Sequence, residues 1–350
     1  SLSHNRQEVL IVHQLLHPHV ETLTERIFWG NVINNFVRGI DWKELWEEGR
    51  SGTDSTPIGH WNLLPLGEPS HGTGDPSAIA LAADGAAVVC LGGVDEIAIR
   101  PGPRQPMMRF SVGRFPSDVA CSSDSRWAFI ANQFDDSVTV VDLQEQKLIS
   151  TISLGSQPKK IAIHRGESLF YDAKLSHDGW YSCHSCHTDG HTNNLLNDNL
   201  GDGTYGAPKR VLTLLGVAET SPWSWRGQRG ELEKQIHDSI ATTMRGPQFA
   251  ASVRNIADID AYIRSLKPPP GVAVARNAAR DKKVARGKQV FTKLDCQNCH
   301  VPPRYTSSAS LDIGMHDKVG NRNFNPPSLR AVSQRDRYFH DGRARTLEAA

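Results

Sequence analysis

Two short segments of the chain share one arrangement, a pair of cysteines two residues apart followed at once by a histidine. Two thiols at this spacing reach the two vinyl groups of one porphyrin, and the adjacent imidazole then lies under the iron as its proximal ligand. The pattern predicts two covalently attached c-type haems. The residues are Cys183, Cys186 and His187 in the first segment, and Cys296, Cys299 and His300 in the second.

Cysteine pairs of this spacing also occur in zinc sites and in redox-active thiol pairs. The four cysteines could together form a tetrahedral zinc site. Zinc, however, does not require a histidine directly after the second cysteine in both segments, so haem is the favoured interpretation, with His187 and His300 as iron ligands. The other two cysteines, Cys90 and Cys121, lie in apolar, strand-like stretches. We expect them to be buried free thiols rather than a disulfide.

The bulk composition narrows the class of protein. A chain of 350 residues is long enough for about two domains. Its formal net charge of +1 gives no reason to expect a nucleic-acid partner. No apolar run reaches about 18 residues, so no membrane-spanning helix is predicted. The chain opens at Ser1, and we expect that a leader has been removed and that the chain is a piece of a longer one.

The segment from about residue 76 to 165 repeats with a period near 40. Three copies open at Pro76, Pro116 and Pro158, which are 40 and 42 residues apart. Such a period, with several short strands in each copy, is typical of β-propeller blades. Strands are predicted at residues 127–132, 137–142 and 148–154 of the second copy, because each is short, rich in β-branched or aromatic residues and bounded by turn residues.

The second copy resembles the YVTN-type β-propeller repeat. The residues Phe129-Ile130-Ala131-Asn132 match its name-giving strand, and 138–142 match the strand that follows. Residues 2–16 look like the inner part of another blade, with a turn at 3–6 and a strand at 9–12. Residues 17–70, which contain Trp29, Trp42 and Trp46, are interpreted as an insertion. Since three or four blades do not close a ring easily, we expect a partial propeller, completed by more of this chain or by other chains.

Beyond about residue 166 the strand repeats stop and helical segments follow. Helices are predicted at 231–243, 256–266 and 277–294, and the prolines of 267–271 make a rigid spacer. The predicted fold class is therefore multidomain, an all-β partial propeller followed by a mostly α-helical, two-lobed di-haem cytochrome c domain. The predicted domains are 1–165 for the propeller with its insertion, 166–270 for the first cytochrome lobe, and 271–350 for a second lobe that is cut short.

Segments around both haem motifs resemble the bacterial di-haem cytochrome c peroxidase family, which includes the MauG-type enzymes. The resemblance covers residues 166–350, about half of the chain. The matching segments are residues 166–176 before the first motif, Trp225-Arg226-Gly227 and Leu232–Gln235 between the motifs, and Pro327–Arg330, Tyr338–Gly342 and Thr346–Glu348 after the second.

The resemblance implies roles for individual residues. His187 is the proximal ligand of the peroxide-facing haem and His300 that of the electron-transfer haem. Trp225 lies between the haems as an electron relay, or else is an aromatic residue of a helical core. Gln235 lines the distal pocket of the first haem, or else is an exposed helix residue.

The family also binds its haems through further groups. Arg226, Arg330 and His340 are predicted to contact the cofactors, and Arg210 and Arg343 are further candidates for the propionates, because guanidinium matches a carboxylate with a rigid fork. Solvated loop arginines are the alternative. The resemblance adds a calcium ion between the haem lobes as a further candidate, although no local acidic loop marks its site.

The sequence departs from the family where peroxide chemistry needs a base. The family places a glutamate just before a methionine after the glutamine, but residues 240–243 before Met244 contain no carboxylate. His237 and Asp238 are candidate substitutes, and His237 could instead ligate iron. Asp202 stands where resting peroxidases place a distal histidine, so an open first haem is predicted. Met315 and His316 are spare candidates for the second iron.

Taken together, these features predict an exported di-haem oxidoreductase of the peroxidase/MauG type in the periplasm or on the cell surface. Electrons would move from the His300 haem to the His187 haem, to reduce peroxide or another small molecule or to oxidise a partner. The expected partners are a redox protein and an oligomer or larger complex. The alternatives are a non-catalytic electron-transfer cytochrome and a subunit of a multi-haem complex with unusual nitrogen chemistry, of the hydrazine synthase kind.

Overall fold

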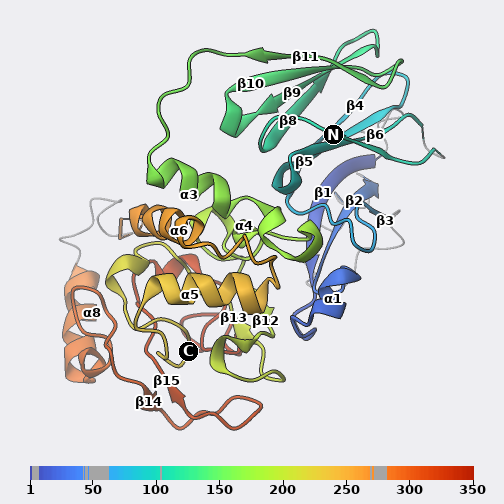
Figure 1. Cartoon of the computed structure of the whole chain (residues 1–350). Coiled ribbons are helices and arrows are strands. Elements are labelled where there is room, and N and C mark those ends of the chain that lie inside the picture. The colour runs from blue at the N-terminus through green and yellow to red at the C-terminus, as the bar shows by residue number, and fades with distance from the viewer. Residues whose placement is uncertain are drawn as a thin grey trace. The chain divides into compact units, whose positions relative to one another are not determined.

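The structure is a computed structural model that describes residues 1, 8–41, 43, 46, 63–102, 105–268, 270–271 and 282–350 (Figure 1). The chain divides into two compact units, and each is described by itself. The first comprises Ser1–Leu16, Thr24–Lys160 and Phe170–Ser185. The second comprises His17–Leu23, Ile161–Leu169 and Cys186–Ala350. The first haem motif therefore crosses from one unit to the other.

The first sheet of the first unit has three antiparallel strands in the order β1-β2-β3. The strands are β1 (Glu8–Leu16), β2 (Ile33–Asp41) and β3 (Leu63–Pro65), with the short helix α1 (Thr24–Phe28) between the first two. The strand predicted at 9–12 is confirmed within β1, whereas the turn predicted at 3–6 and Trp42 lie outside the described residues. Part of the predicted insertion thus supplies β2 and β3 to the same sheet as β1.

Two further sheets follow, each a four-stranded antiparallel meander. Both carry a register shift within their first strand, between Pro76 and Ala78 in one and between Pro116 and Asp118 in the other. The 40-residue repeat of the sequence is therefore a structural repeat, and the predicted strands of the second copy are confirmed. The strands are β4 (Pro76–Leu81), β5 (Ala87–Leu91), β6 (Glu96–Arg100) and β7 (Met108–Ser111), then β8 (Pro116–Cys121), β9 (Trp127–Asn132), β10 (Ser137–Asp142) and β11 (Lys147–Ser153).

The middle sheet is buried on both faces, because successive side chains of a strand point to opposite sides. Val88 and Cys90 of β5 pack in one apolar cluster with residues of the β8–β11 sheet. Val89 and Leu91 pack in another with Val37 of β2 and with Leu66. Three sheets thus stack through two cores. Cys90 is a buried free thiol as predicted, whereas Cys121 is a free thiol that is only partly buried. Burial raises the pKa of the Cys90 thiol to about 12.

The third predicted copy of the repeat is wrong. Residues 158–161 form no strand, and helix α3 (Ala162–Phe170) follows at once. Arg165 of α3 forms a two-pronged ion pair with Asp258, with nitrogen–oxygen distances of 2.7 and 2.6 Å. Tertiary packing against a helix 90 residues away therefore decides the conformation here. No closed ring of blades is present among the described residues, and the propeller stays a prediction.

The second unit is mostly helical. The helices predicted between the haem motifs are confirmed as α5 (Leu232–Asp238), which continues as a π-helical turn at Ser239–Thr243, and α6 (Val253–Ser265). Helix α8 (Lys282–Lys293) confirms the last part of the third predicted helix, whose first residues are not described. Two short hairpins complete the unit, β12 (Leu196–Asn197) with β13 (Lys209–Arg210), and β14 (Leu311–Asp312) with β15 (Asn323–Phe324).

Helix α6 shows how the sequence fixes these elements locally. The Ser252 side chain caps its first turn by accepting a hydrogen bond from the Asn255 amide. Ile256, Ile259 and Ile263 recur at helical spacing and are buried. The helix therefore presents one apolar face to the core of the unit.

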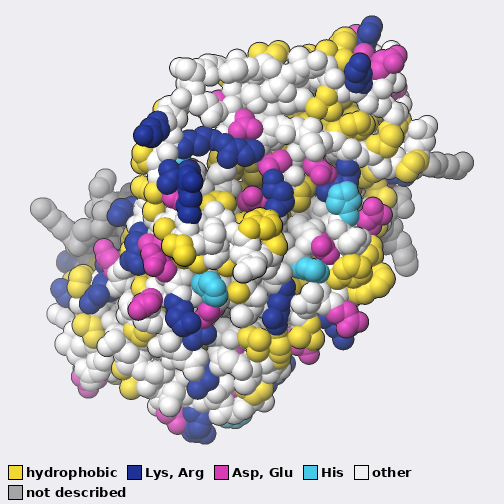
Figure 2. Space-filling view, in the orientation of Figure 1, with side chains coloured by type: hydrophobic (Ala, Val, Ile, Leu, Met, Phe, Trp, Pro, Cys, Tyr) yellow, Lys and Arg dark blue, Asp and Glu magenta, His cyan; other side chains and the backbone are white. Residues whose placement is uncertain are grey.

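The surface is mixed in character. Basic and acidic side chains are interspersed over the face shown in Figure 2, in keeping with the formal net charge of +1. Within the described part of the chain, none of the helices has the length and apolar composition that crossing a membrane requires.

The contact between α3 and α6 makes a first prediction. A methyl group at Gly166 would lie 1.8 Å from the carbonyl oxygen of Asp258, a backbone atom that cannot move cheaply. We expect Gly166→Ala to lower the free energy of unfolding by about 3 kcal/mol, as overpacking does. Gly287→Ala on α8, where the added methyl meets nothing, should instead raise it by about 0.5–1 kcal/mol. Denaturant titration of both variants measures the difference, and equal stabilities would contradict the close helix contact.

Candidate di-haem site

The imidazole of the first motif is fixed by a hydrogen bond from a distant segment. His187 follows the short helix α4 (Cys183–Cys186), and its Nδ1–H donates to the carbonyl oxygen of Leu212 at 2.9 Å. Burial lowers the pKa of His187 to about 4, although hydrogen bonds with the Leu212 and His191 backbone act in the opposite sense. The ring is therefore neutral at physiological pH and its lone pair lies on Nε2. A neutral imidazole oriented through Nδ1 is the form that ligates iron.

The second motif repeats this arrangement with a different partner. It begins with a 3₁₀ turn at Cys296–Asn298, and the backbone amide of His300 donates to the Cys296 carbonyl at 2.9 Å. The Nδ1–H of His300 donates to the carbonyl oxygen of Tyr305 at 3.0 Å. Both histidines thus fit the predicted role of iron ligand through Nε2.

The zinc alternative does not fit the structure. Across the described ranges, which include all four motif cysteines, no three His, Cys, Asp or Glu side chains gather as a metal site. A single tetrahedral site built from Cys183, Cys186, Cys296 and Cys299 is therefore not formed.

Trp225 lies between the segments that follow the two motifs. Its indole Nε1–H donates to the Arg210 carbonyl at 2.7 Å, and its own carbonyl accepts from the Asn325 amide at 2.8 Å. The Arg210 guanidinium lies 5.2 Å from the centre of the ring. The His340 ring meets the indole edge-on, with ring centroids 6.3 Å apart. The buried indole thus contacts residues of both predicted lobes, as a relay requires.

His340 is almost fully enclosed, with 2% of its surface exposed. It stacks on Phe324, with ring centroids 4.2 Å apart and the planes at 13°. Its Nε2 is buried without a hydrogen-bond partner, although the Asp341 carboxylate lies 4.0 Å from it, and burial lowers its pKa. A buried polar nitrogen without a partner is costly in a folded protein. This position therefore fits a polar group of a cofactor.

Two arginines beside this cluster are buried without a carboxylate. Arg210 donates to the backbone oxygens of Phe339 and Val211 only, and burial, followed by repulsion from Arg335, lowers its pKa to about 10. Arg335 donates to backbone oxygens, and its Nε has no partner. Among the described residues neither arginine forms an ion pair with an acidic side chain. Two buried cations of this kind need a counter-charge, and the propionates of c-type haem supply one.

The arginines chosen from the sequence have other partners. Arg226 donates to the Asp202 carbonyl at 3.0 Å while its buried Nε has none. Arg330 is ion-paired with Glu219 at 2.7 Å, and Arg343 with Asp341 at 2.7 Å. Of the predicted arginines, Arg210 and Arg226 are thus better placed than Arg330 and Arg343 to hold a propionate.

The predicted distal residues lie on α5. The Gln235 amide donates to Ser239 at 3.2 Å, and its Oε1 is buried without a hydrogen-bond partner. His237 is about half exposed and faces the neighbouring Asp238 at 3.3 Å. Asp238 is also ion-paired with Arg229 at 3.1 Å. The helix therefore presents the Gln235 amide oxygen without a hydrogen-bond partner, whereas the Asp238 carboxylate is already ion-paired with Arg229.

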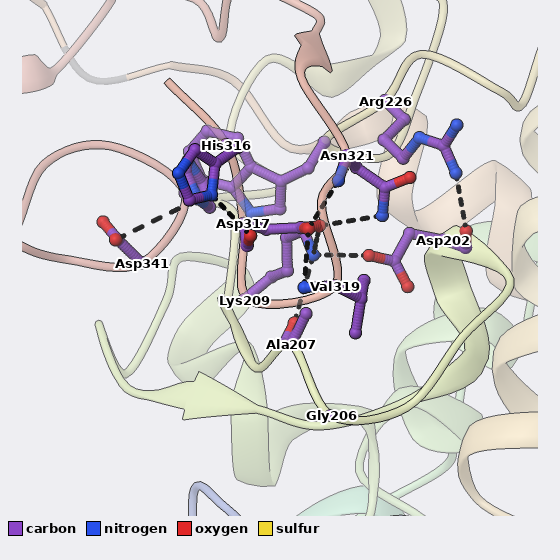
Figure 3. Close-up of polar contacts among 12 residues, drawn as sticks. Asp202, Gly206, Ala207, Lys209, Arg226, His316, Asp317, Val319, Asn321 and Asp341 are labelled. Carbon is purple, nitrogen blue, oxygen red and sulfur yellow. Dashed lines mark hydrogen bonds and ion pairs between the residues drawn. The ribbon is translucent and has the colours of Figure 1, made fainter.

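A buried lysine joins the segments after the two motifs (Figure 3). The Lys209 ammonium bonds to the Asp202 carboxylate, to the Asp317 carboxylate at 2.8 Å and to the Ala207 carbonyl at 3.1 Å. Burial alone would raise the pKa of Asp317, but hydrogen bonds from Lys209 and Asn321 lower it to about 2. The structure does not support the calcium prediction, because these paired carboxylates already hold a cation of the chain itself.

Sequence reasoning missed Lys209 and Arg335. Arg335 belongs to the charged run 335–337, which looks like a solvated loop, and Lys209 lies in an ordinary polar stretch. No local signal marks either residue. Only the pairing of β12 with β13 and the return of the chain after the second motif bring them into the interior.

Comparison with known proteins agrees with this geometry. The profile of a family described as di-haem cytochrome c peroxidase matches residues 160–285 and 281–350, more than half of the chain. The chain belongs to the di-haem cytochrome c peroxidase family. Membership implies haem c as the cofactor, which fits the two fixed imidazoles and the buried polar groups beside them.

Several curated proteins are similar to this member of the di-haem cytochrome c peroxidase family. The methylamine utilization protein MauG of Methylorubrum extorquens is 28% identical over 244 residues, which are 55% of this chain and 67% of that protein. The cytochrome c551 peroxidase of Nitrosomonas europaea is 27% identical over 238 residues, 53% of this chain and 70% of that protein. Hydrazine synthase subunit gamma of Kuenenia stuttgartiensis is 25% identical over 242 residues, 54% of this chain and 68% of that protein.

The buried lysine makes the second prediction. Lys209→Met leaves two buried carboxylates without a cation, so we expect the free energy of unfolding to fall by about 3–5 kcal/mol at pH 7. Lys288→Met on the exposed face of α8 is the matched control and should have little effect.

The pH dependence of this loss is a check on its cause. In the parent protein the lowered pKa of Asp317 contributes stability above the unfolded value of about 4, and that contribution is lost as the pH falls toward 2. In Lys209→Met the Asp317 carboxylate takes up a proton more readily, so the deficit should shrink below about pH 4. A deficit that is the same at pH 3 and pH 7 would show that Lys209 acts through packing alone.

Proposed function

We propose that the chain is an exported di-haem c oxidoreductase of the cytochrome c peroxidase/MauG type. In this proposal electrons would pass from the haem held by His300 toward the haem held by His187, by way of Trp225. The His187 haem would then supply the site at which a peroxide or another small molecule is reduced, or a bound partner is oxidised. The observation that carries the proposal is buried Trp225, whose indole donates to the Arg210 carbonyl and whose backbone carbonyl accepts from the Asn325 amide.

The residues of the chain divide the work of holding the cofactors. When bound, the haems supply one-electron redox chemistry and an iron position at which a small molecule can bind. His187 and His300 would hold the irons through Nε2, since Nδ1 of each is committed to a backbone carbonyl. Arg210 and Arg335 would bind propionates, and His340 Nε2, which has no hydrogen-bond partner, could donate to the same groups.

The predicted distal residues offer no evident base for the proton transfer that peroxide cleavage needs. Peroxide cleavage needs a base within hydrogen-bonding reach of the reacting oxygen. Residues 240–243 contain no carboxylate, His237 faces solvent, and Asp238 is bound to Arg229. Gln235 can accept a hydrogen bond through Oε1 but cannot take up a proton. We therefore infer that the physiological reaction is the oxidation of a bound partner rather than the turnover of peroxide.

The second candidate function is a non-catalytic electron carrier or a subunit of a larger multi-haem complex. The missing carboxylate favours it, and so does the similarity to a protein named as a subunit, hydrazine synthase subunit gamma. The two functions differ in coordination, because a carrier keeps both irons six-coordinate whereas an enzyme needs one vacant position.

Covalent attachment of haem bears on location and partners. We propose that the chain acts in the periplasm or on the cell surface, where c-type haems are attached. A redox protein then delivers or removes electrons. The stacked sheets of the first unit are proposed as blades of a propeller that docks this partner or the rest of an assembly.

Optical and electron-paramagnetic-resonance spectra of the oxidised protein, before and after hydrogen peroxide, test the proposal. We expect one high-spin and one low-spin haem, with the high-spin spectrum changed by peroxide. His187→Gly should remove the high-spin signal and leave the low-spin one. Two low-spin haems whose spectra do not change with peroxide would contradict the enzymatic function and support a non-catalytic electron carrier.

The relay makes a further prediction. Trp225→Phe removes the indole nitrogen and its bond to the Arg210 carbonyl while keeping an aromatic ring. We expect electron transfer between the haems to slow by roughly tenfold, which corresponds to about 1.4 kcal/mol on the barrier. Trp223→Phe is the matched control, since the Trp223 indole bonds instead to Val217. Rapid-mixing reduction followed at the two haem absorptions measures the rate, and equal slowing in both variants would argue against a relay at Trp225.

A further inference from the structure

The residues enclosed by the first cysteine pair are held by the sheets of the first unit. The Ser185 hydroxyl donates to Oδ1 of Asp75 at 2.8 Å, and the Ser182 hydroxyl donates to its Oδ2. His184 Nδ1 lies 3.5 Å from the same carboxylate. One carboxylate thus contacts two positions inside the Cys183–Cys186 loop and the position just before it. No sequence signal pointed to Asp75, which lies about 110 residues upstream.

Asp75 is itself rigidly placed. Its side chain is 4% exposed, and its carbonyl accepts a hydrogen bond from the Gly92 amide at 3.0 Å. Its φ of +50° is unusual for a residue other than glycine, and especially for one that precedes a proline. Strained positions of this kind persist only where the surrounding structure fixes them. Among the described residues, no lysine or arginine forms an ion pair with Asp75, so its charge is not neutralised by a permanent cation.

Aromatic packing fixes the other side of the loop. The Tyr171 ring stacks on His184, with centroids 4.5 Å apart. Tyr171 also contacts Phe115, which directly precedes β8, and Phe134, which lies in the turn between β9 and β10, with ring centroids 5.1 and 5.7 Å from that of Tyr171. The loop is therefore clamped between an aromatic cluster and Asp75.

Three glycines of the first unit lie so close to Trp180 that a larger side chain at any of them would clash with it. A methyl group at Gly30 or Gly67 would lie within 2.7 Å of the Trp180 indole, and one at Gly72 would lie 2.6 Å from the Trp180 amide. Trp180, and with it the segment 170–185, therefore packs closely against the rest of the first unit. The family match begins at residue 160, so Asp75 comes from a part of the chain that the family does not cover.

We propose that Asp75 is a positioning residue of the first haem site, whose fixed negative charge favours the oxidised state of the iron ligated by His187. The proposal rests on the haem assignment in the proposed function. A buried negative charge beside the attachment loop stabilises ferric over ferrous iron, because the ferric centre carries one more positive charge. Burial removes most of the screening by salt that a surface carboxylate undergoes.

The test is the reduction potential of each haem in Asp75→Asn, which keeps the shape of the side chain and removes its charge. Spectroelectrochemical titration of the full, haem-loaded chain should show the His187 haem more easily reduced. At a fixed applied potential its ratio of reduced to oxidised form should rise about three- to tenfold. The His300 haem should not change. Asp118→Asn, at an exposed position of β8, is the charge-matched control and should leave both potentials unaltered.

A second variant separates the charge from the anchoring. Ser182→Ala with Ser185→Ala removes two hydrogen bonds to the carboxylate but keeps every charge. The potential of the His187 haem should then stay at the parent value or fall. This double variant also decides the question if Asp75→Asn does not accumulate with two haems, because a rise in potential would overturn the role of the charge.

The outcomes distinguish this inference from the proposed function. Unchanged potentials in Asp75→Asn with two haems attached would overturn the role of Asp75 alone. A parent protein without two covalent haems per chain, measured as the pyridine haemochrome, would overturn the proposed function as well.

Discussion

A histidine ligates haem iron only while its imidazole is neutral and correctly oriented. The path of the chain after the first motif in the second unit places a backbone carbonyl that orients the His187 imidazole. The carbonyl that holds Nδ1 belongs to Leu212, so the chain must return to the motif after 25 residues. The same returning strand presents the Arg210 carbonyl to Trp225 and the Arg210 amide to the carbonyl of His340. One segment therefore orients the His187 imidazole, the Trp225 indole and the end of the second predicted lobe together.

Two neighbouring residues of that segment, Lys209 and Arg210, differ in how the charge of the side chain is balanced in the interior. Lys209 is neutralised by Asp202 and Asp317, so this part of the fold holds its own cation and anions. Arg210, the next residue, has no acidic partner among the described residues and shares its environment with Arg335. The Arg210 guanidinium thus lies on the Trp225 ring with only a longer-range attraction to Asp336, and an anionic cofactor bound there would offset its charge.

The division of the chain into two units does not coincide with the boundary of the first haem motif. The first haem motif begins in the sheet unit, where Asp75 and the Tyr171 cluster fix its loop, and ends in the helical unit. A sheet that only docked a partner would not need a buried carboxylate against this loop. Asp75, which directly precedes β4, and the Tyr171 cluster therefore help to fix the residues of the first cysteine pair.

Local patterns in the sequence determined the haem motifs, the paired meanders and the helices α5 and α6, because cysteine spacing and the periods of two and 3.6 residues act within a few residues. The same reasoning failed at Pro158, where a third blade was expected, since the pairing of Arg165 with Asp258 stabilises a helix instead. It also gave no sign of Asp75, Lys209 or Arg335. These three residues matter because distant segments fold over them and remove water, and burial of that kind is decided only by the tertiary structure.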